Sequence, residues 1–277
     1  MTVTVRPFKE GFGAEIVGID LARPFGAVER AAVYRAFLDH HLVSIRGQTL
    51  TPAQTVATAR IFGDRLEPHL FKQYHHPETP LVMVLSNRVA NGKPAGMADA
   101  GTFWHSDVSY KPNPAKATML YAIEVPEGEG DTLFCDLTAA YDALPEAMKR
   151  RLQGMMAVHN YDHVPRDVFQ RLNTTPPPDC AHPVVRTHPE TGRKAIYINP
   201  AYVVRIEGLA DAESEALKQE IYDHCLQDHF RLAYRWKAGD VVAWDNAALM
   251  HSATTRTLDP AKHRTLWRMT VSGGPAF

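Results

Sequence analysis

Residues 102–108 read Thr-Phe-Trp-His-Ser-Asp-Val. The aromatic and β-branched residues around His105 and Asp107 predict a short strand, and the alternation of a strand would point both side chains to the same face. Two metal ligands would then come from one short element. Because His-x-Asp is a very short motif, the alternative is that His105 is a hydrogen-bonded residue of the core.

A third ligand is expected far along the chain. Two histidines and one carboxylate on one side of a metal leave adjacent coordination positions open, an arrangement that favours iron(II) oxygen chemistry. His251 is the candidate because it follows residues 240–246, Asp-Val-Val-Ala-Trp-Asp-Asn, which predict a strand running into a turn. One histidine among 14 is weak evidence by itself.

Two arginines follow His251. Arg264 and Arg268 have the even spacing that puts both on one face of a predicted last strand, with Leu266 between them. If that face points inward, the guanidinium groups must meet anions, because buried unpaired charge is costly and the fork of arginine suits a carboxylate or sulfonate. The alternative is a pair of arginines that face solvent on an edge strand.

The rest of the chain predicts a mainly β protein with surrounding helices. Short β-branched or aromatic runs predict strands at 14–17, 42–45, 117–123, 184–187, 195–198, 234–236, 241–244 and 265–272. Apolar spacing predicts helices at 28–40, 145–155 and 211–226. Residues 187–192 predict a hairpin loop, and residues 173–183, with four prolines, predict a surface loop.

One further helix has a marked start. Thr51 is expected to be its N-cap, with Pro52 at the first helical position and Gln54 at the capping-box position. Gly63 is expected to end this helix.

Composition excludes several classes of protein. The 277 residues are 45% hydrophobic and 22% charged, an ordinary globular balance. The net charge of -1 and the lack of a Lys/Arg block argue against nucleic acid as the main partner and favour a small molecule. Three widely spaced cysteines (Cys135, Cys180, Cys225), no signal-peptide pattern and no membrane-length apolar run predict a cytoplasmic protein without a membrane partner. We expect one domain over 1–277 and a homo-oligomer.

These residues together resemble the taurine dioxygenase and 2,4-dichlorophenoxyacetate dioxygenase family of iron(II)/2-oxoglutarate oxygenases. The resemblance covers nearly the whole chain. It is carried by residues 104–108, Gly-Asp-Thr at 130–132, His-Pro-Val-Val-Arg-Thr-His-Pro at 182–189, Trp-Asp-Asn at 244–246 leading to His251, and the closing Arg264 and Arg268. It implies a double-stranded β-helix, or jelly roll, with helices packed outside.

The resemblance also implies the roles of individual residues. Fe(II) and the cosubstrates 2-oxoglutarate and O2 would be used to hydroxylate a small organic anion, with succinate and CO2 as coproducts. The implied set comprises the metal ligands His105, Asp107 and His251, the 2-oxoglutarate-binding residues Thr132 and Arg264, and the substrate-binding residues Arg268, His69 and Tyr202. Without the resemblance, Gly-Asp-Thr at 130–132 would predict only a turn.

Gly101 departs from the family pattern, because taurine dioxygenase has an asparagine at this place in its substrate pocket. We therefore expect extra space and an anion that is bulkier or less polar than taurine, such as a sulfonate, a sulfate ester, an aryloxyalkanoate or another carboxylate. Two alternatives remain. A metal-dependent hydrolase or isomerase on the same fold would not need Arg264 and Arg268, and an anion-binding module would not need the metal ligands.

Overall fold

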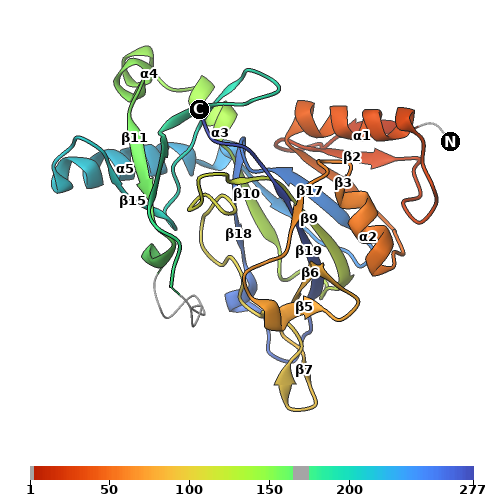
Figure 1. The fold of residues 1–277 in the computed structure, drawn as a ribbon. Coiled ribbons are helices and arrows are strands. Elements are labelled where there is room, and N and C mark those ends of the chain that lie inside the picture. The colour runs from red at the N-terminus through yellow and green to blue at the C-terminus, as the bar shows by residue number, and fades with distance from the viewer. Residues whose placement is uncertain (1–2, 165–174) are drawn as a thin grey trace.

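The computed structural model describes residues 3–164 and 175–277 and is β-rich with several helices (Figure 1). The α-helices are α1 (Ala27–His40), α2 (Pro52–Ala59), α3 (Leu137–Asp142), α4 (Glu146–Leu152) and α5 (Asp211–Cys225). The 3-10 helices are η1 (Lys72–Tyr74), η2 (Tyr161–His163), η3 (Asp228–Phe230) and η4 (Thr255–Thr257). The strands are β1 (Thr4–Pro7), β2 (Ala14–Val17), β3 (Leu42–Ile45), β4 (Leu66–Glu67), β5 (His75–His76), β6 (Thr79–Ser86), β7 (Val89–Ala90), β8 (Lys93–Pro94), β9 (Ala115–Glu124), β10 (Thr132–Asp136), β11 (Met156–His159), β12 (Cys180–Pro183), β13 (Val185–Thr187), β14 (Lys194–Ile196), β15 (Val203–Ile206), β16 (Arg231–Tyr234), β17 (Val241–Asp245), β18 (Leu249–Ala253) and β19 (Thr265–Ser272).

Two sheets dominate the described residues. The larger sheet has the strand order β1-β2-β3-β17-β9-β19-β6-β5, and β4 pairs with β19. A smaller sheet has the order β16-β10-β18. In the chain, β10 directly follows β9, and β16 and β18 lie on either side of β17. Neighbouring strands are therefore mostly far apart in the chain, and Figure 1 shows β9, β17 and β19 side by side.

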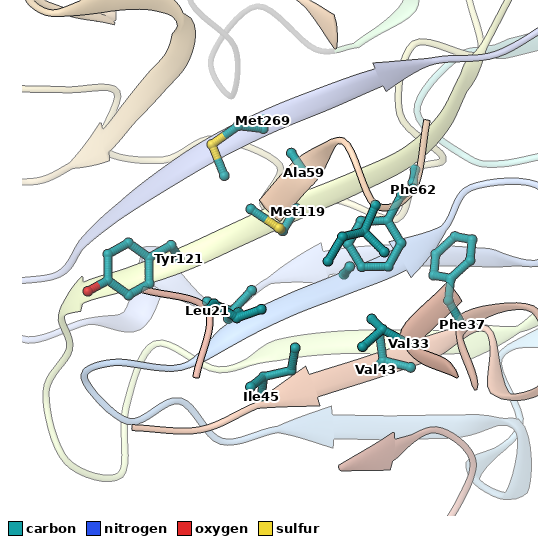
Figure 2. Close-up of a cluster of buried hydrophobic side chains, with 14 of the residues drawn as sticks. Leu21, Val33, Phe37, Val43, Ile45, Ala59, Phe62, Met119, Tyr121 and Met269 are labelled. Carbon is teal, nitrogen blue, oxygen red and sulfur yellow. The ribbon is translucent and has the colours of Figure 1, made fainter. Parts of the chain in front are cut away.

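One face of the larger sheet packs against α1 and α2. Phe37 of α1 and Phe62 after α2 lie with ring centroids 4.9 Å apart, over Met119 of β9 and Met269 of β19 (Figure 2). Side chains alternate between the two faces along each strand, and the odd-numbered residues of β9 and β17 face the helices. This face forms an apolar core and holds no candidate site residue.

The other face of the larger sheet points toward the smaller sheet. Trp244 of β17 contacts Phe134 of β10, with ring centroids 5.3 Å apart, and Leu120 of β9 joins the same buried cluster. Thr118 lies on this face as well, opposite Trp244 in the β9–β17 register. The space between the two sheets is where the candidate site residues meet.

Several strands and one helix cap lie where the sequence predicted them. The predicted strands 14–17, 42–45 and 265–272 coincide with β2, β3 and β19. At the start of α2, Thr51 Oγ1 accepts from the amide of Gln54 and the Gln54 side chain accepts from the amide of Thr51. The helix ends at Ala59 and not at Gly63, because the chain turns early and buries Phe62 against Phe37.

The hairpin predicted around residues 187–192 is confirmed, since β13 pairs with β14 on either side of it. The strand predicted at 234–236 lies earlier, and only Tyr234 belongs to β16. The loop predicted at 173–183 was partly wrong, because its last four residues form β12 and pair with β11. Residues 173 and 174 of that loop lie outside the described residues.

The strand predicted at 102–108 was wrong. His105 forms a single β-bridge with His251, and a turn follows from Ser106. The turn contains Val108 at a φ of 60°, a conformation that a β-branched residue rarely adopts. Within the described residues, no helix combines the length and the apolar character needed to cross a membrane.

Candidate metal centre and active site

Three buried side chains from distant segments converge between the sheets. Each of His105, Asp107 and His251 offers one ligand atom, and these atoms all lie within 4.8 Å of one another. His105 Nε2 lies 3.4 Å from Asp107 Oδ1, and His251 Nε2 lies 3.6 Å from Asp107 Oδ2. The residues that the sequence singled out as metal ligands thus face one point.

Backbone hydrogen bonds hold the two histidines together. The amide of His105 donates to the carbonyl of His251 at 3.0 Å, and the amide of His251 donates back at 2.8 Å. His251 lies in the middle of β18, paired with Phe134 of β10. This reciprocal bridge, and not a strand at 102–108, places both imidazoles on the same side.

The donor set fits a divalent metal ion. His105 Nδ1 lies 2.8 Å from the carbonyl oxygen of Phe103, so Nδ1 carries a proton and Nε2 faces the cluster. Burial, followed by the nearby His105, holds the pKa of His251 well below its ordinary value, and its ring is neutral. Two imidazoles and a carboxylate are the donors that bind non-haem iron(II).

Asp107 is kept as an anion. Burial alone would raise the pKa of its carboxyl group, but the Arg268 guanidinium and the two imidazoles hold that pKa well below its ordinary value. Arg268 Nη2 donates to Asp107 Oδ1 at 2.8 Å, and Thr118 Oγ1 donates to Asp107 Oδ2 at 2.6 Å. Each carboxylate oxygen of Asp107 therefore accepts a hydrogen bond from one side chain.

A cavity of about 40 Å³ adjoins these ligands, and Thr132, Arg264 and Arg268 are among its lining residues. Arg264 is buried, and its Nε donates to the carbonyl of Gly130 at 2.9 Å. Its two Nη groups donate to none of the described residues. Burial lowers the pKa of Arg264 to about 10, so the side chain is still a cation at neutral pH.

Thr132 begins β10, although its sequence context predicted a turn. Its Oγ1 accepts a hydrogen bond from Trp236 Nε1 at 3.0 Å. Thr132 and Arg264 lie on one wall of the cavity that reaches His105. The structure thus brings together the residues expected to bind 2-oxoglutarate.

A second cavity, of about 30 Å³, meets the first at His105, Asp107 and Arg268. His69 and Tyr202, both singled out from the sequence, are among its lining residues. Phe103 and Tyr110 also line this cavity, and no local feature of the sequence indicated a role for them. The ring centroids of Tyr110 and Tyr202 are 4.9 Å apart, and one tyrosine thus supports the other.

The expectation that Gly101 opens extra space is wrong for this structure. Gly101 lines both cavities, but a Cβ at this position would lie 2.7 Å from Cε1 of His105. The imidazole of His105 already fills the place. Gly101 therefore says nothing about the size of the substrate, and its effect is on the histidine.

A β-rich fold that encloses two imidazoles, a carboxylate and a buried arginine has the features of a mononuclear non-haem metal oxygenase. The family described as taurine catabolism dioxygenase TauD, TfdA family matches residues 4–270, and the chain belongs to this family. It is an α-ketoglutarate-dependent dioxygenase, and α-ketoglutarate is another name for 2-oxoglutarate. This membership excludes the binding-module and hydrolase alternatives.

The relatives agree in cosubstrate and differ in substrate. The α-ketoglutarate-dependent 2,4-dichlorophenoxyacetate dioxygenase of Cupriavidus pinatubonensis is 35% identical over 286 residues, which cover 98% of both chains. The α-ketoglutarate-dependent sulfate ester dioxygenase of Pseudomonas putida is 30% identical, over 91% of this chain and 84% of that protein. The crystal structure of AAD-2 in complex with Mn(II) and N-oxalylglycine has a TM-score of 0.80 and 27% identity, and the match covers 100% of both chains.

Proposed function

We propose that the protein binds Fe(II) through His105, Asp107 and His251. The observation that carries the proposal is the convergence of two buried imidazoles and one anionic carboxylate beside a cavity. The Mn(II) in the AAD-2 structure supports a divalent ion in this fold, and the donor set favours iron(II) over other divalent ions through its open positions.

Arg264 and Thr132 are proposed to bind the distal carboxylate of 2-oxoglutarate. The free Nη groups of Arg264 face a cavity that ends at the proposed metal ligands, and a carboxylate matches the guanidinium in charge and shape. N-oxalylglycine, which is 2-oxoglutarate with an NH in place of a CH2, is bound in the related AAD-2 structure. When bound, Fe(II) and 2-oxoglutarate supply the chemistry that consumes O2 and releases succinate and CO2.

Arg268 is proposed to bind the anionic group of the prime substrate. Its Nε is buried and has no acceptor in the part of the chain that the structure describes, and such a lone donor is costly. Arg268 also lines both cavities, so an anion in the second cavity would lie beside the metal centre. His69 and Tyr202 would contact the rest of this substrate.

The relatives indicate which anions to consider. Among them are dioxygenases of 2,4-dichlorophenoxyacetate, of (S)-phenoxypropionate and of sulfate esters. We propose a small organic anion of these kinds, or a sulfonate, as the substrate that is hydroxylated. The aromatic lining of the second cavity suits an apolar group attached to the anion.

The remaining expectations are proposals about the whole chain. The two facing sheets support a double-stranded β-helix, or jelly roll, and a single catalytic domain over residues 1–277. Cys135, Cys180 and Cys225 are free, as expected in a reducing cytoplasm, and we propose that location. A homo-oligomer stays a prediction from the sequence.

One assay tests the function. The full chain with Fe(II) and 2-oxoglutarate is expected to consume O2 and form succinate in proportion when a suitable anion is added. A panel of aryloxyalkanoates, alkyl sulfates, sulfonates and matched neutral alcohols identifies the substrate class. His105→Ala is expected to abolish turnover, and Arg268→Ala is expected to abolish the response to the anion. Equal stimulation by the neutral compounds would contradict the role of Arg268.

A further inference from the structure

The carboxylate of Asp107 rests on a second group of buried polar side chains behind it. Thr118, in the middle of β9, and Asn246, in the turn after β17, are both 0% exposed. We propose that Thr118 and Asn246 are positioning residues that fix the orientation of the Asp107 carboxylate for the metal ion. The inference rests on the proposed metal site and concerns residues that do not bind the metal themselves.

The contacts form a continuous chain from Trp244 to Asp107. Trp244 Nε1 donates to Asn246 Oδ1 at 3.2 Å, and Asn246 Nδ2 donates to Thr118 Oγ1 at 3.1 Å. Thr118 Oγ1 then donates to Asp107 Oδ2 at 2.6 Å. Asn246 Oδ1 also accepts from the backbone amide of Asp107 at 3.2 Å, so Asn246 holds both the main chain and, through Thr118, the side chain.

The chemistry of the groups fixes the direction of these hydrogen bonds. An indole nitrogen and a backbone amide can only donate, so the atom of Asn246 that faces them must be its oxygen. Its nitrogen therefore faces Thr118, whose oxygen must accept. The single hydroxyl proton of Thr118 is then left for Asp107, and it favours the ionised carboxylate that a metal requires.

The two donors to Asp107 differ in how firmly they are held. Arg268, which donates to Oδ1, has a side chain that is 12% exposed and borders both cavities. A bound substrate anion would compete for its guanidinium group. Thr118, which donates to Oδ2, is fully enclosed in the sheet and already bonded to Asn246. Thr118 therefore continues to donate to Asp107 when the guanidinium group of Arg268 binds a substrate anion.

The same group of residues also supports a second proposed ligand. The ring of Trp244 packs edge-on against the ring of His251, with centroids 4.6 Å apart. Trp244 is fixed in turn by its bond to Asn246. Asn246 therefore helps to position two proposed ligands, Asp107 through Thr118 and His251 through Trp244. Loss of its bond to Thr118 should weaken metal binding.

The test is the affinity of the metal-free full-length chain for Mn(II), measured from the electron paramagnetic resonance signal of free Mn(II). Thr118→Val replaces the hydroxyl by a methyl group of similar size and is expected to raise the dissociation constant about 10- to 100-fold. Thr118→Ser keeps the hydroxyl and is expected to stay within about threefold of the original protein. Thr58→Val is the matched control, since Thr58 is also 0% exposed and donates one hydrogen bond, to the Gln54 carbonyl, far from the site.

The outcomes separate this inference from the proposed function. Folded Thr118→Val with an unchanged dissociation constant would overturn the positioning role. If Thr118→Val does not fold, Thr118→Ala removes the same donor without added apolar bulk, and unchanged Mn(II) binding by that variant would overturn it equally. No Mn(II) binding by the original protein, or equal binding by His105→Ala, would instead overturn the proposed metal site.

Discussion

Gly101 sets how closely the backbone can approach the first imidazole. Its φ is +71°, and an added Cβ would lie 2.7 Å from Cε1 of His105, closer than carbon atoms normally approach. His105 cannot move aside freely, because its Nδ1 is bonded to the Phe103 carbonyl and its backbone is bridged to His251. A methyl group at position 101 must therefore displace a proposed metal ligand.

Gly101→Ala is accordingly expected to weaken Mn(II) binding by tenfold or more, in the range found when the support of a metal ligand is lost. Gly192→Ala is the matched control, because Gly192 has the same φ of +71° and no described atom lies within 4 Å of the added Cβ. Both variants should lose about 1 kcal/mol of stability through the backbone conformation. Equal Mn(II) affinities of the two variants would show that the clash is relieved without cost to the site.

Arg264 offers a second test at the level of a single residue. Its guanidinium is buried, and only its Nε is bonded to a described group, so the Nη groups are available to an anion. Arg264→Ala is expected to weaken 2-oxoglutarate binding by about 2 to 5 kcal/mol, the effect of losing a buried charged partner. The measurement is the affinity for 2-oxoglutarate with Mn(II) present. An unchanged value would remove Arg264 from the cosubstrate site.

Among the elements, the connection between β9 and β10 positions Arg264. Gly130 in this connection has a φ of +75°, and its carbonyl accepts from Arg264 Nε. A Cβ on Gly130 would lie 2.9 Å from Arg264 Cδ. The glycine thus permits a close approach that aims the guanidinium into the cavity.

Gly130→Ala should therefore raise the dissociation constant for 2-oxoglutarate by about tenfold, equivalent to about 1.4 kcal/mol, and leave Mn(II) binding unchanged. Gly128→Ala provides the comparison, since Gly128 belongs to the same connection, has the same φ of +75°, and has no described atom within 4 Å of the added Cβ. A similar loss of cosubstrate affinity in both variants would assign the effect to the turn as a whole, and the contact with Arg264 would then be irrelevant.

The predictability of an element depended on whether its signal is local. The cap at Thr51 and the hairpin at 187–192 were predictable because residues a few positions apart determine them. The strand β10 was not predicted, since it is stabilised by pairing with β16 and β18, about a hundred residues away. Asn91-Gly92 is a local hairpin signal that was not used in the predictions above, and both residues adopt positive φ between β7 and β8.

The geometry of the site also depends on contacts between residues far apart in the chain, which the sequence did not predict. The sequence identified His105, Asp107 and His251 by type and order, but it assigned the first two to a strand that does not exist. What aligns them is the β-bridge from His105 to His251, a contact across 146 positions (251 − 105). Thr118 was not identified at all, and Asn246 was noted only as part of the motif at 244–246, because nothing in their local sequence reveals a bond to Asp107.

At the scale of the whole molecule, the alternation along each strand separates two environments. On β17, Val241 and Ala243 face the helices, whereas Val242 and Trp244 face the smaller sheet. The sequence encodes this alternation, but it does not say that β17, β9 and β19 are neighbours. The metal ligands, the arginines and their support come together only through that order of strands.

Buried histidines also make the stability of the molecule depend on pH. His69 and His159 both have their pKa lowered to about 3, and burial is the main cause in each. Asn199 Nδ2 donates to Ser109 Oγ, which lies 3.1 Å from His159 Nδ1, and His159 Nε2 has no partner among the described residues. Burial therefore disfavours the cationic form of both imidazoles in the folded chain.

In the unfolded chain these histidines regain a pKa of about 6.5. Between about pH 6.5 and pH 3 the unfolded state therefore binds more protons, and the free energy of unfolding should fall as the pH falls, by about 1.4 kcal/mol per pH unit for each histidine. His159→Asn keeps a polar side chain beside Ser109 but cannot be protonated. Between pH 6 and pH 4, its free energy of unfolding, measured from urea unfolding curves, should therefore fall by about 1.4 kcal/mol per pH unit less than that of the original protein. His229→Asn, which changes an exposed histidine, should lose as much free energy of unfolding between pH 6 and pH 4 as the original protein does. If His159→Asn and the original protein lose stability in parallel, the acid sensitivity has another origin than the buried imidazole.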